Sequence, residues 1–324
     1  MDGNIRHVDL QGKSRVLIFG ATGYMGHFIA MASLESAHPT FAFVRPSALQ
    51  DPVRAEVLSN LRSSGIHIIA GSLEDPESLV RAIQGVDVVI SLLGGAQIME
   101  QLKIIDAIKE VGTVKRFLPS EFGHDVDRAE PIEPALSFYE TKRRIRRATE
   151  EAKIGYTYIC CNSIAGWPYH YHTHPSKMLP PTDKIHIYGD GNIKAYFMTG
   201  RDIGSYTVRA IEDPRALNKK LHFRPADNFL TMNELSVIWQ KQLGKKLPVA
   251  VISEEDLLKC ARANVIPASI VAAITHDIFI KGCQFNFSIE GEEDEEACQL
   301  YPDIKYTKLE DYFSSFSSNL QPEN

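Results

Sequence analysis

The residues of this sequence with the clearest chemical potential are three glycines spaced three apart, Gly20, Gly23 and Gly26. They follow an apolar run at 16–19 and precede a segment with the apolar spacing of a helix. A strand that ends in a tight glycine turn exposes the first N–H groups of the next helix, and these favour a pyrophosphate. The pattern therefore predicts a dinucleotide site. Its expected contacts are Gly20, Thr22, Gly23, Tyr24, Met25 and Gly26.

A basic residue stands where the second strand should end. Dinucleotide-binding domains that select NAD carry an acid there, which binds the ribose 2′-hydroxyl. This sequence has Arg45, followed by Ser47, and Arg54 opens the next helix. Because a guanidinium matches a phosphate bidentately, these residues predict that the coenzyme is NADPH.

Lys142 is the main candidate for chemistry on a substrate. Short-chain reductases usually place a tyrosine four residues before such a lysine, so that both share a helix face. Position 138 is Phe here, and Tyr139 lies three residues before Lys142, rotated from the usual place. We therefore expect Lys142 to bind the nicotinamide ribose, to act as a base, or to do both, with Arg146 facing the same ligand. The remaining arginines of this run are expected on a solvated face: Arg143, Arg144 and Arg147.

His124 follows the fifth predicted strand, within the segment 119–125. The carboxyl ends of parallel strands form the ligand side of an open α/β sheet, and an imidazole titrates near neutral pH. His124 is therefore a candidate general acid, with Asp125 as a group that could orient it. The alternative is a surface histidine beside an aspartate. In the same loop, Phe122 is expected to contact the coenzyme.

Short β-branched runs alternate with helix-length segments from residue 14 to about 117, which predicts an α/β fold with a doubly wound parallel Rossmann sheet. We expect an NADPH-binding Rossmann domain over 1–165 and a smaller C-terminal α/β substrate lobe over 166–324, some segments of which return to the sheet. The expected strands are 16–19, 40–44, 67–70, 86–92, 116–118 and 156–161, and the expected helices include 136–153, 231–243, 254–264 and 268–279.

Composition excludes several classes of protein. A net charge of −6 and a pI near 6.0 give no basic surface for nucleic acid. No apolar run reaches the roughly 18 residues of a membrane helix, and the first residues are too polar for a signal peptide, so a cytoplasmic protein without membrane contacts is expected.

Metal binding is also disfavoured. The five cysteines show no C-x-x-C spacing, so neither a zinc site nor a disulfide framework is predicted. His170, His172 and His174 alternate in the segment 169–174, but no acid or cysteine lies beside them. A surface or substrate-lid loop is therefore the favoured interpretation, and no metal is expected.

Several segments together resemble the plant isoflavone-reductase-like family of atypical short-chain reductases, which includes pinoresinol-lariciresinol, phenylcoumaran benzylic ether, isoflavone and leucoanthocyanidin reductases. The resemblance rests on the glycine loop, Val44-Arg45-Pro46, residues 117–123 and the Lys142 helix, and it covers nearly the whole chain. Three segments further resemble the signatures of the leucoanthocyanidin reductase subgroup: Arg116-Phe117-Leu118-Pro119, Ile159-Cys160-Cys161-Asn162 and Thr275-His276-Asp277.

The resemblance implies reduction of a 2,3-trans-flavan-3,4-diol to a catechin-type flavan-3-ol with NADPH. It implies that Lys142 helps to deprotonate a ring hydroxyl while His124 protonates the departing 4-hydroxyl, which leaves a quinone methide. Tyr139, Asn162 and His124 would contact the flavonoid substrate. The expected assembly is a monomer or a homodimer.

Two alternatives stay open. A sister reductase of lignans, phenylcoumaran benzylic ethers or isoflavones would share NADPH and the lysine. A non-catalytic NADP(H) sensor, like the nitrogen-metabolite-repression regulators, would bind the coenzyme without turnover. The presence of both Lys142 and His124 argues against the sensor.

Overall fold

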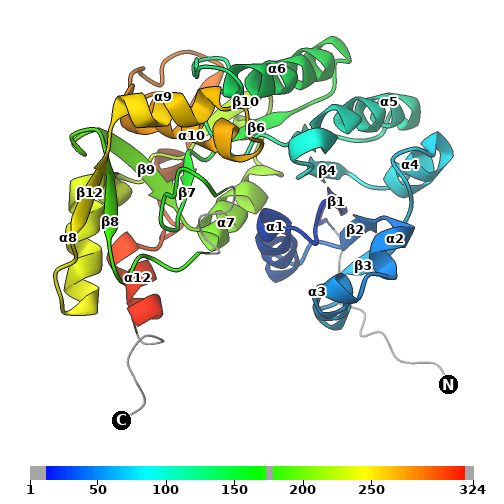
Figure 1. Cartoon of the computed structure of the whole chain (residues 1–324). Coiled ribbons are helices and arrows are strands. Elements are labelled where there is room, and N and C mark those ends of the chain that lie inside the picture. The colour runs from blue at the N-terminus through cyan, green and yellow to red at the C-terminus, as the bar shows by residue number, and fades with distance from the viewer. Residues whose placement is uncertain (1–11, 173–177, 318–324) are drawn as a thin grey trace. The chain divides into compact units, whose positions relative to one another are not determined.

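Two units, each assembled from separate stretches of the chain, make up the computed structural model, which describes residues 12–172 and 178–317 (Figure 1). Unit 1 contains Met1–Ser120, Ile145–Thr157 and Gly204–Asn218, and unit 2 contains Glu121–Arg144, Tyr158–Ile203 and Lys219–Asn324. The division of the chain at residue 165 stays a prediction.

A five-stranded sheet forms the centre of unit 1, with the strand order β3-β2-β1-β4-β5 and only parallel pairs. Its middle strand is almost completely buried, as a parallel strand covered on both faces must be. The predicted doubly wound sheet is confirmed. The order reverses between β1 and β4, the point where ligands bind in such sheets. The strands are β1 (Val16–Phe19), β2 (Thr40–Val44), β3 (His67–Ala70), β4 (Val88–Ser91) and β5 (Arg116–Leu118).

Helices cover both faces of this sheet, with α1 and α3 on one side and α4 and α5 on the other (Figure 1). Two of them begin with an aspartate cap followed by a proline: Asp51 and Asp75 accept hydrogen bonds from Val53 N (3.0 Å) and Ser78 N (3.2 Å). The helices are α1 (Tyr24–Glu35), α2 (Pro46–Leu49), α3 (Pro52–Ser63), α4 (Pro76–Ile83) and α5 (Gln101–Val111), with a 3-10 helix η1 (Gly95–Glu100) before α5.

The predicted sixth strand forms as β6 (Thr157–Cys160), but it belongs to another sheet. Beside β5 the chain makes only an isolated parallel bridge, Phe117 with Tyr156, and Gly155 O accepts from Phe117 N at 2.8 Å. Gly155 permits this approach, since a Cβ there would lie 2.6 Å from Lys115 O. The chain then pairs with β10 (Lys219–His222).

Unit 2 contains three small sheets, with the orders β13-β10-β6, β11-β9-β7 and β12-β8. The remaining strands are β7 (Ser163–Ile164), β8 (Ile185–Tyr188), β9 (Lys194–Met198), β11 (Phe229–Thr231), β12 (Val249–Ile252) and β13 (Asp294–Glu296). The helices are α8 (Met232–Leu243), α9 (Glu254–Arg262), α10 (Ala268–Phe279), α11 (Ala297–Leu300) and α12 (Leu309–Ser317), with η4 (Ala226–Asn228). Two helices have residues in both units, α6 (Ala135–Glu151) and α7 (Gly200–Ala210), and η3 (Pro214–Ala216) lies in unit 1.

Aromatic side chains dominate the core of unit 2. Trp167 and Trp239 are both buried, and each ring centroid lies about 6 Å from that of Phe313 (6.1 and 5.9 Å). Tyr139 of α6 belongs to the same buried cluster. The core therefore holds the part of α6 that carries the candidate catalytic residues. Over the described ranges, the structure has no helix with both the length and the apolar character needed to span a membrane.

Candidate active site

The glycine loop of unit 1 has the geometry of a phosphate cradle. Gly20 adopts a left-handed backbone (φ +87°), and Gly23 N donates to Gly20 O at 3.0 Å. Gly23 then caps α1 without a side-chain hydrogen bond. The residues present fit a dinucleotide, because the start of α1 offers backbone donors and its positive dipole end to a pyrophosphate.

Gly26 has no room for a side chain. A Cβ at this position would lie 2.0 Å from Gly20 O and 2.7 Å from Ala21 Cα, both backbone atoms. Gly26→Ala is therefore expected to displace the loop and to weaken NADPH binding by about 100-fold. Fluorescence titration with NADPH, alongside a urea unfolding curve to check the fold, measures the effect. A variant that binds NADPH as tightly as the wild type would contradict this role of the loop.

The basic residues predicted for the 2′-phosphate lie at the end of β2 and the start of α3. Arg45 is the exposed N-cap residue of α2, and Ser47 is exposed in the same short helix. Arg54 reaches the glycine loop itself, because its Nη1 donates to Thr22 Oγ1 at 2.9 Å. These positions suit an anion beside the loop, and contact with the coenzyme stays a prediction.

In unit 2, α6 carries Tyr139 and Lys142 one turn apart, close enough to be neighbours on the helix. The Lys142 ammonium donates to Glu121 O at 2.6 Å and lies 5.5 Å from the centre of the Phe138 ring. The phenylalanine at the usual tyrosine position therefore supports the lysine through a cation–π contact. Phe122, next to Glu121, has a left-handed backbone (φ +31°), a strained conformation of the kind that clusters at functional sites.

His124 is buried between two polar side chains. Its Nδ1 lies 2.6 Å from Tyr139 Oη, and its Nε2 lies 3.0 Å from Gln284 Nε2. The expectation that Asp125 could orient this imidazole is wrong, because both ring nitrogens face other partners. Burial, together with the Lys142 charge, lowers the pKa of His124 from 6.5 to about 4, so the imidazole is neutral at physiological pH.

This lowered pKa predicts an acid-sensitive unit 2. Unfolded His124 binds a proton near pH 6.5 and folded His124 only near pH 4, so the unfolded state binds more protons between these values. Stability should therefore fall as the pH drops from 6.5 to 4, by roughly 3 kcal/mol for this group. His124→Asn, which keeps a polar atom near Nδ1, is expected to remove that part of the pH dependence.

Urea unfolding at several pH values, followed by tryptophan fluorescence, measures the free energy of unfolding of the wild type and of His124→Asn. Fluorescence reports on unit 2 because both tryptophans lie there. The comparison concerns the slope of the unfolding free energy against pH, not its absolute value. Identical slopes for the wild type and His124→Asn would refute the proposed cause.

Tyr139 is a neutral phenol in this setting. Burial raises its pKa well above 10, and nearby Cys283, Asp277 and Glu121 raise it further. Cys283 and Asp277 both lie in the stretch that begins with the Thr275-His276-Asp277 signature. One residue of this signature, Asp277, therefore lies near enough to act on the tyrosine.

Two other predicted site residues are held inside the protein. The Asn162 backbone is left-handed (φ +60°), and its side-chain Nδ2 donates to Phe223 O at 2.9 Å. Arg146 is fully buried, with 0% of its surface exposed. Contacts of Asn162 with a substrate and of Arg146 with a coenzyme stay predictions.

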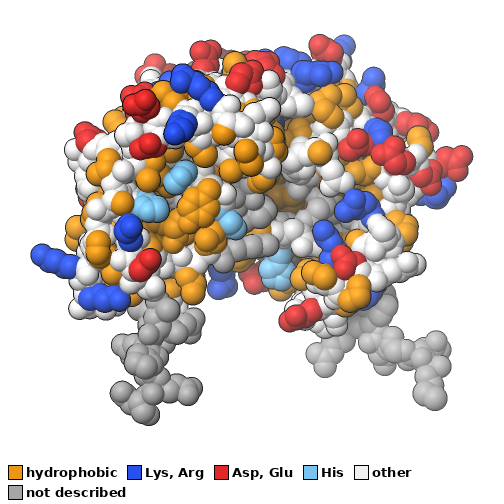
Figure 2. Space-filling view, viewed as in Figure 1, with side chains coloured by type: hydrophobic (Ala, Val, Ile, Leu, Met, Phe, Trp, Pro, Cys, Tyr) orange, Lys and Arg blue, Asp and Glu red, His pale blue; other side chains and the backbone are white. Residues whose placement is uncertain are grey.

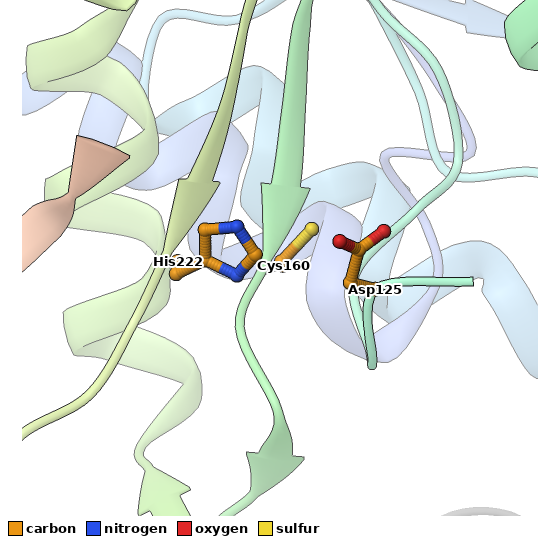
Figure 3. A group of neighbouring side chains, drawn as sticks. All are labelled: Asp125, Cys160 and His222. Atoms are coloured by element: carbon orange, nitrogen blue, oxygen red, sulfur yellow. The ribbon is translucent and has the colours of Figure 1, made fainter. Parts of the chain in front are cut away.

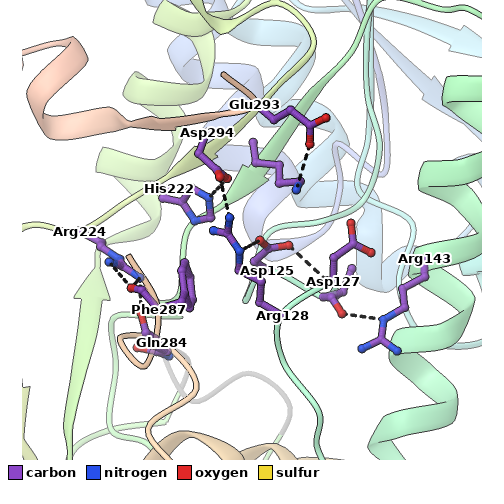
Figure 4. A network of polar contacts seen from close by, with 12 residues as sticks. Asp125, Asp127, Arg128, Arg143, His222, Arg224, Gln284, Phe287, Glu293 and Asp294 are labelled. Atoms are coloured by element: carbon purple, nitrogen blue, oxygen red, sulfur yellow. Dashed lines mark hydrogen bonds and ion pairs between the residues drawn. The ribbon is translucent and has the colours of Figure 1, made fainter. Parts of the chain in front are cut away.

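Asp125 belongs to a second buried group. Asp125, Cys160 and His222 place potential metal-ligand atoms within 4.8 Å of one another, with Cys160 between the other two (Figure 3). His222 Nε2 lies 2.8 Å from Asp294 Oδ1, and the Arg128 guanidinium lies 2.6 Å from Asp294 and 3.6 Å from Asp125 (Figure 4).

The charges in this group already compensate one another. Burial alone would raise the pKa of the Asp294 carboxyl, but hydrogen bonds from His222 and Arg128 outweigh it and lower the pKa to about 2. The Arg128 cation lies between the two carboxylates and would repel a metal ion. We interpret the group as an ion network that joins the loop after His124 to β10 and β13.

The described part of the histidine-rich segment belongs to unit 2. Figure 2 shows several histidine side chains beside hydrophobic ones on the face in view. His170 N donates to Tyr188 Oη at 3.0 Å, and the His170 and His186 ring centroids lie 6.4 Å apart. Burial, with a contribution from His186, lowers the pKa of His170. His174 lies outside the described residues, so the loop interpretation is tested only for its first part.

A comparison with known proteins decides the family, because the model of the NmrA-like family matches residues 12–313. The chain belongs to the NmrA-like family. Within it, the resemblance to the isoflavone-reductase-like proteins is confirmed by two curated relatives. The chain is 49% identical to a leucoanthocyanidin reductase from Desmodium uncinatum, over 94% of the chain and 80% of the relative. It is also 49% identical to a phenylcoumaran benzylic ether reductase from Nicotiana tabacum, over 94% of the chain and 99% of the relative.

The fold of this NmrA-like chain is also that of a solved relative. The binary complex of leucoanthocyanidin reductase with NADPH from Vitis vinifera superposes with a TM-score of 0.90 at 49% identity, covering 94% of this chain and 99% of that one. The predicted fold class is therefore confirmed.

Sequence reasoning missed Gln284, which contacts His124 in the fold. It lies 160 residues further along the chain, and a glutamine has no spacing pattern that marks it as functional. Its place just after the signature at 275–277 was the one signal that could have drawn attention to it.

Proposed function

We propose that this chain reduces a 2,3-trans-flavan-3,4-diol, such as leucocyanidin, to a catechin-type flavan-3-ol. The chain is an NADPH-dependent oxidoreductase, as its similarity to named reductases and to an NADPH complex supports. The substrate is the proposed part, because the identity is 49% to reductases with two different substrates.

One observation carries the substrate assignment: segments that resemble the leucoanthocyanidin reductase signatures converge on the His124–Tyr139 pair. Asp277 and Cys283, in and just after the third signature, act on the Tyr139 phenol. Asn162, which ends the second signature, lies close to the pair. Its backbone N donates to the carbonyl oxygen of Gly123, the residue before His124, at 2.9 Å. Residues of two of the three segments thus lie near the proposed reacting groups, which supports the assignment.

The first signature contributes differently. Arg116 of β5 donates through Nη2 to Asp213 O at 3.0 Å and through Nη1 to Ala210 O, all within unit 1. Its neighbours Phe117 and Leu118 are fully buried. This segment is therefore part of the buried sheet of unit 1.

Lys142 and His124 are the proposed catalytic residues. In its neutral form, Lys142 takes a proton from the ring hydroxyl para to the reacting carbon. The departing 4-hydroxyl takes a proton from the His124–Tyr139 pair and leaves as water, so that a neutral quinone methide remains. Bound NADPH supplies the hydride that this electrophile accepts. Lys142 then returns its proton to the phenolate, and the net reaction consumes one NADPH and one proton.

The other proposed roles concern binding. Phe122, Lys142 and Arg146 are assigned to the nicotinamide end of the coenzyme, and the glycine loop with Arg45, Ser47 and Arg54 to its phosphates. Tyr139 and Asn162 are assigned to the substrate. Since no carbonyl needs protonating, the scheme requires no tyrosine at position 138, where the chain has Phe.

A substrate panel tests the proposal. The purified protein is incubated with NADPH and, separately, with leucocyanidin, pinoresinol, dehydrodiconiferyl alcohol and a 2′-hydroxyisoflavone. Catechin is the expected product. Turnover of another panel member without catechin would assign a sister reductase, and coenzyme binding without any turnover would favour the sensor.

A further inference from the structure

We infer that Gln284 is a positioning residue that holds His124 in the tautomer protonated at Nδ1, so that the imidazole donates to Tyr139. This inference rests on the proposed role of His124 in proton transfer. Gln284, 160 residues further along the chain than His124, thereby becomes part of the site, and the proton is assigned to one nitrogen of the imidazole.

The orientation of the Gln284 amide follows from a backbone contact. Its Oε1 accepts from Tyr196 N at 2.8 Å, and a backbone N–H can only donate. The carbonyl oxygen of the side chain therefore faces Tyr196. The NH₂ group consequently faces the other two neighbours, Ser163 and His124.

Both hydrogens of this NH₂ group are in use. Gln284 Nε2 donates to Ser163 Oγ at 2.7 Å and lies 3.0 Å from His124 Nε2. The Gln284 residue is 1% exposed, so water does not compete for these contacts. A donor at this distance requires His124 Nε2 to be an acceptor, which means that it carries no proton.

The remaining proton of the neutral imidazole must then sit on Nδ1. That nitrogen lies 2.6 Å from Tyr139 Oη, and it donates to this oxygen. The hydroxyl proton of Tyr139 therefore points away from the histidine. In this geometry the Tyr139 hydroxyl is the group of the pair that can donate its proton to a third group. The imidazole stabilises the tyrosine oxygen by donating to it from Nδ1.

Within residues 12–172 and 178–317, no charged or titratable neighbour of the pair forms a hydrogen bond with His124 Nε2. Lys142 acts on His124 as a positive charge. The groups that act on Tyr139 are Cys283, Asp277, Glu121 and Arg143. Gln284, although uncharged, is thus the side chain positioned to select the tautomer.

The test is a long-range ¹H–¹⁵N correlation spectrum of substrate-free enzyme labelled with ¹⁵N-histidine. His124→Asn identifies the His124 signals by their loss. We expect a neutral ring with a protonated Nδ1 and no titration between about pH 5 and 8. A protonated Nε2 in the wild type would overturn the inference without any need for a variant.

Gln284→Glu provides the second arm. The carboxylate still accepts from Tyr196 N but offers an oxygen where the NH₂ group was, so His124 must donate from Nε2. We expect the His124 pKa to rise into the range of about pH 5–8, and kcat to fall at least about tenfold with a new ionisation in its pH profile and little change in KM. Gln299→Glu adds the same charge at an exposed position of unit 2 and should leave the His124 signals unchanged.

An unchanged tautomer and pKa in folded Gln284→Glu would refute the inference. Since the spectra need no substrate, this outcome is independent of whether the enzyme makes catechin. Failure of the substrate assignment would likewise leave the tautomer measurement intact.

Discussion

Lys142→Met is expected to lower kcat by about 1000-fold, the largest effect that we predict for one side chain on the chemical step. Methionine fills a similar volume, but it cannot take the proton from the ring hydroxyl and it loses the cation–π contact with Phe138. It also loses the hydrogen bond to Glu121 O. Stopped-flow and steady-state assays with NADPH and leucocyanidin measure the loss.

Arg144→Met is the matched control, because Arg144 lies on the same helix with an exposed side chain. It should keep turnover near the wild-type value, as expected for a solvated basic face. Lys142→Met enzyme that still turns over at a comparable rate would show that the proposed base is elsewhere.

Arg45→Asp is expected to reverse the coenzyme preference. The substitution removes the guanidinium proposed to bind the 2′-phosphate and places a like charge beside it. We expect kcat/KM to fall about 100-fold or more with NADPH, since hydrogen bonds to charged groups contribute about 1.5–3 kcal/mol and repulsion adds to their loss. With NADH the change should stay small, because Asp can accept from the ribose 2′-hydroxyl.

Arg62→Asp makes the same change of charge at an exposed position of α3 in the same unit, and it should affect both coenzymes little. Steady-state kinetics with each coenzyme compare the two variants. An equal loss for NADPH and NADH in Arg45→Asp would exclude Arg45 as the selecting residue.

Local patterns were sufficient to predict most of the elements. The strand at Val16–Phe19 and the helix at Ala268–Phe279 form within the predicted bounds, because buried apolar runs and helix periodicity are properties of neighbouring residues. The caps at Asp51 and Asp75 are also local. Parallel order then follows from the alternation of strands and helices.

Long-range pairing was not predictable in the same way. The strand near Cys160 was expected in the Rossmann sheet, yet it pairs with β10, and no local pattern specifies that choice. Asp125 lies next to His124 in sequence, but it faces the Arg128 network instead. Gln284 meets His124 only because the chain folds back after α10. For the strand and for Gln284 the decisive partner is remote in sequence. Arg128 lies only three residues from Asp125, but it is also paired with Asp294, 166 residues further on.

Hydride transfer to the flavandiol is tested most directly with leucocyanidin and NADPH that carries deuterium at the transferable position of the nicotinamide. We expect catechin with one deuterium at C4, and none at C2 or C3, by NMR and mass spectrometry. Catechin without deuterium at C4, or no catechin from a protein that reduces pinoresinol or dehydrodiconiferyl alcohol, would contradict the proposed function.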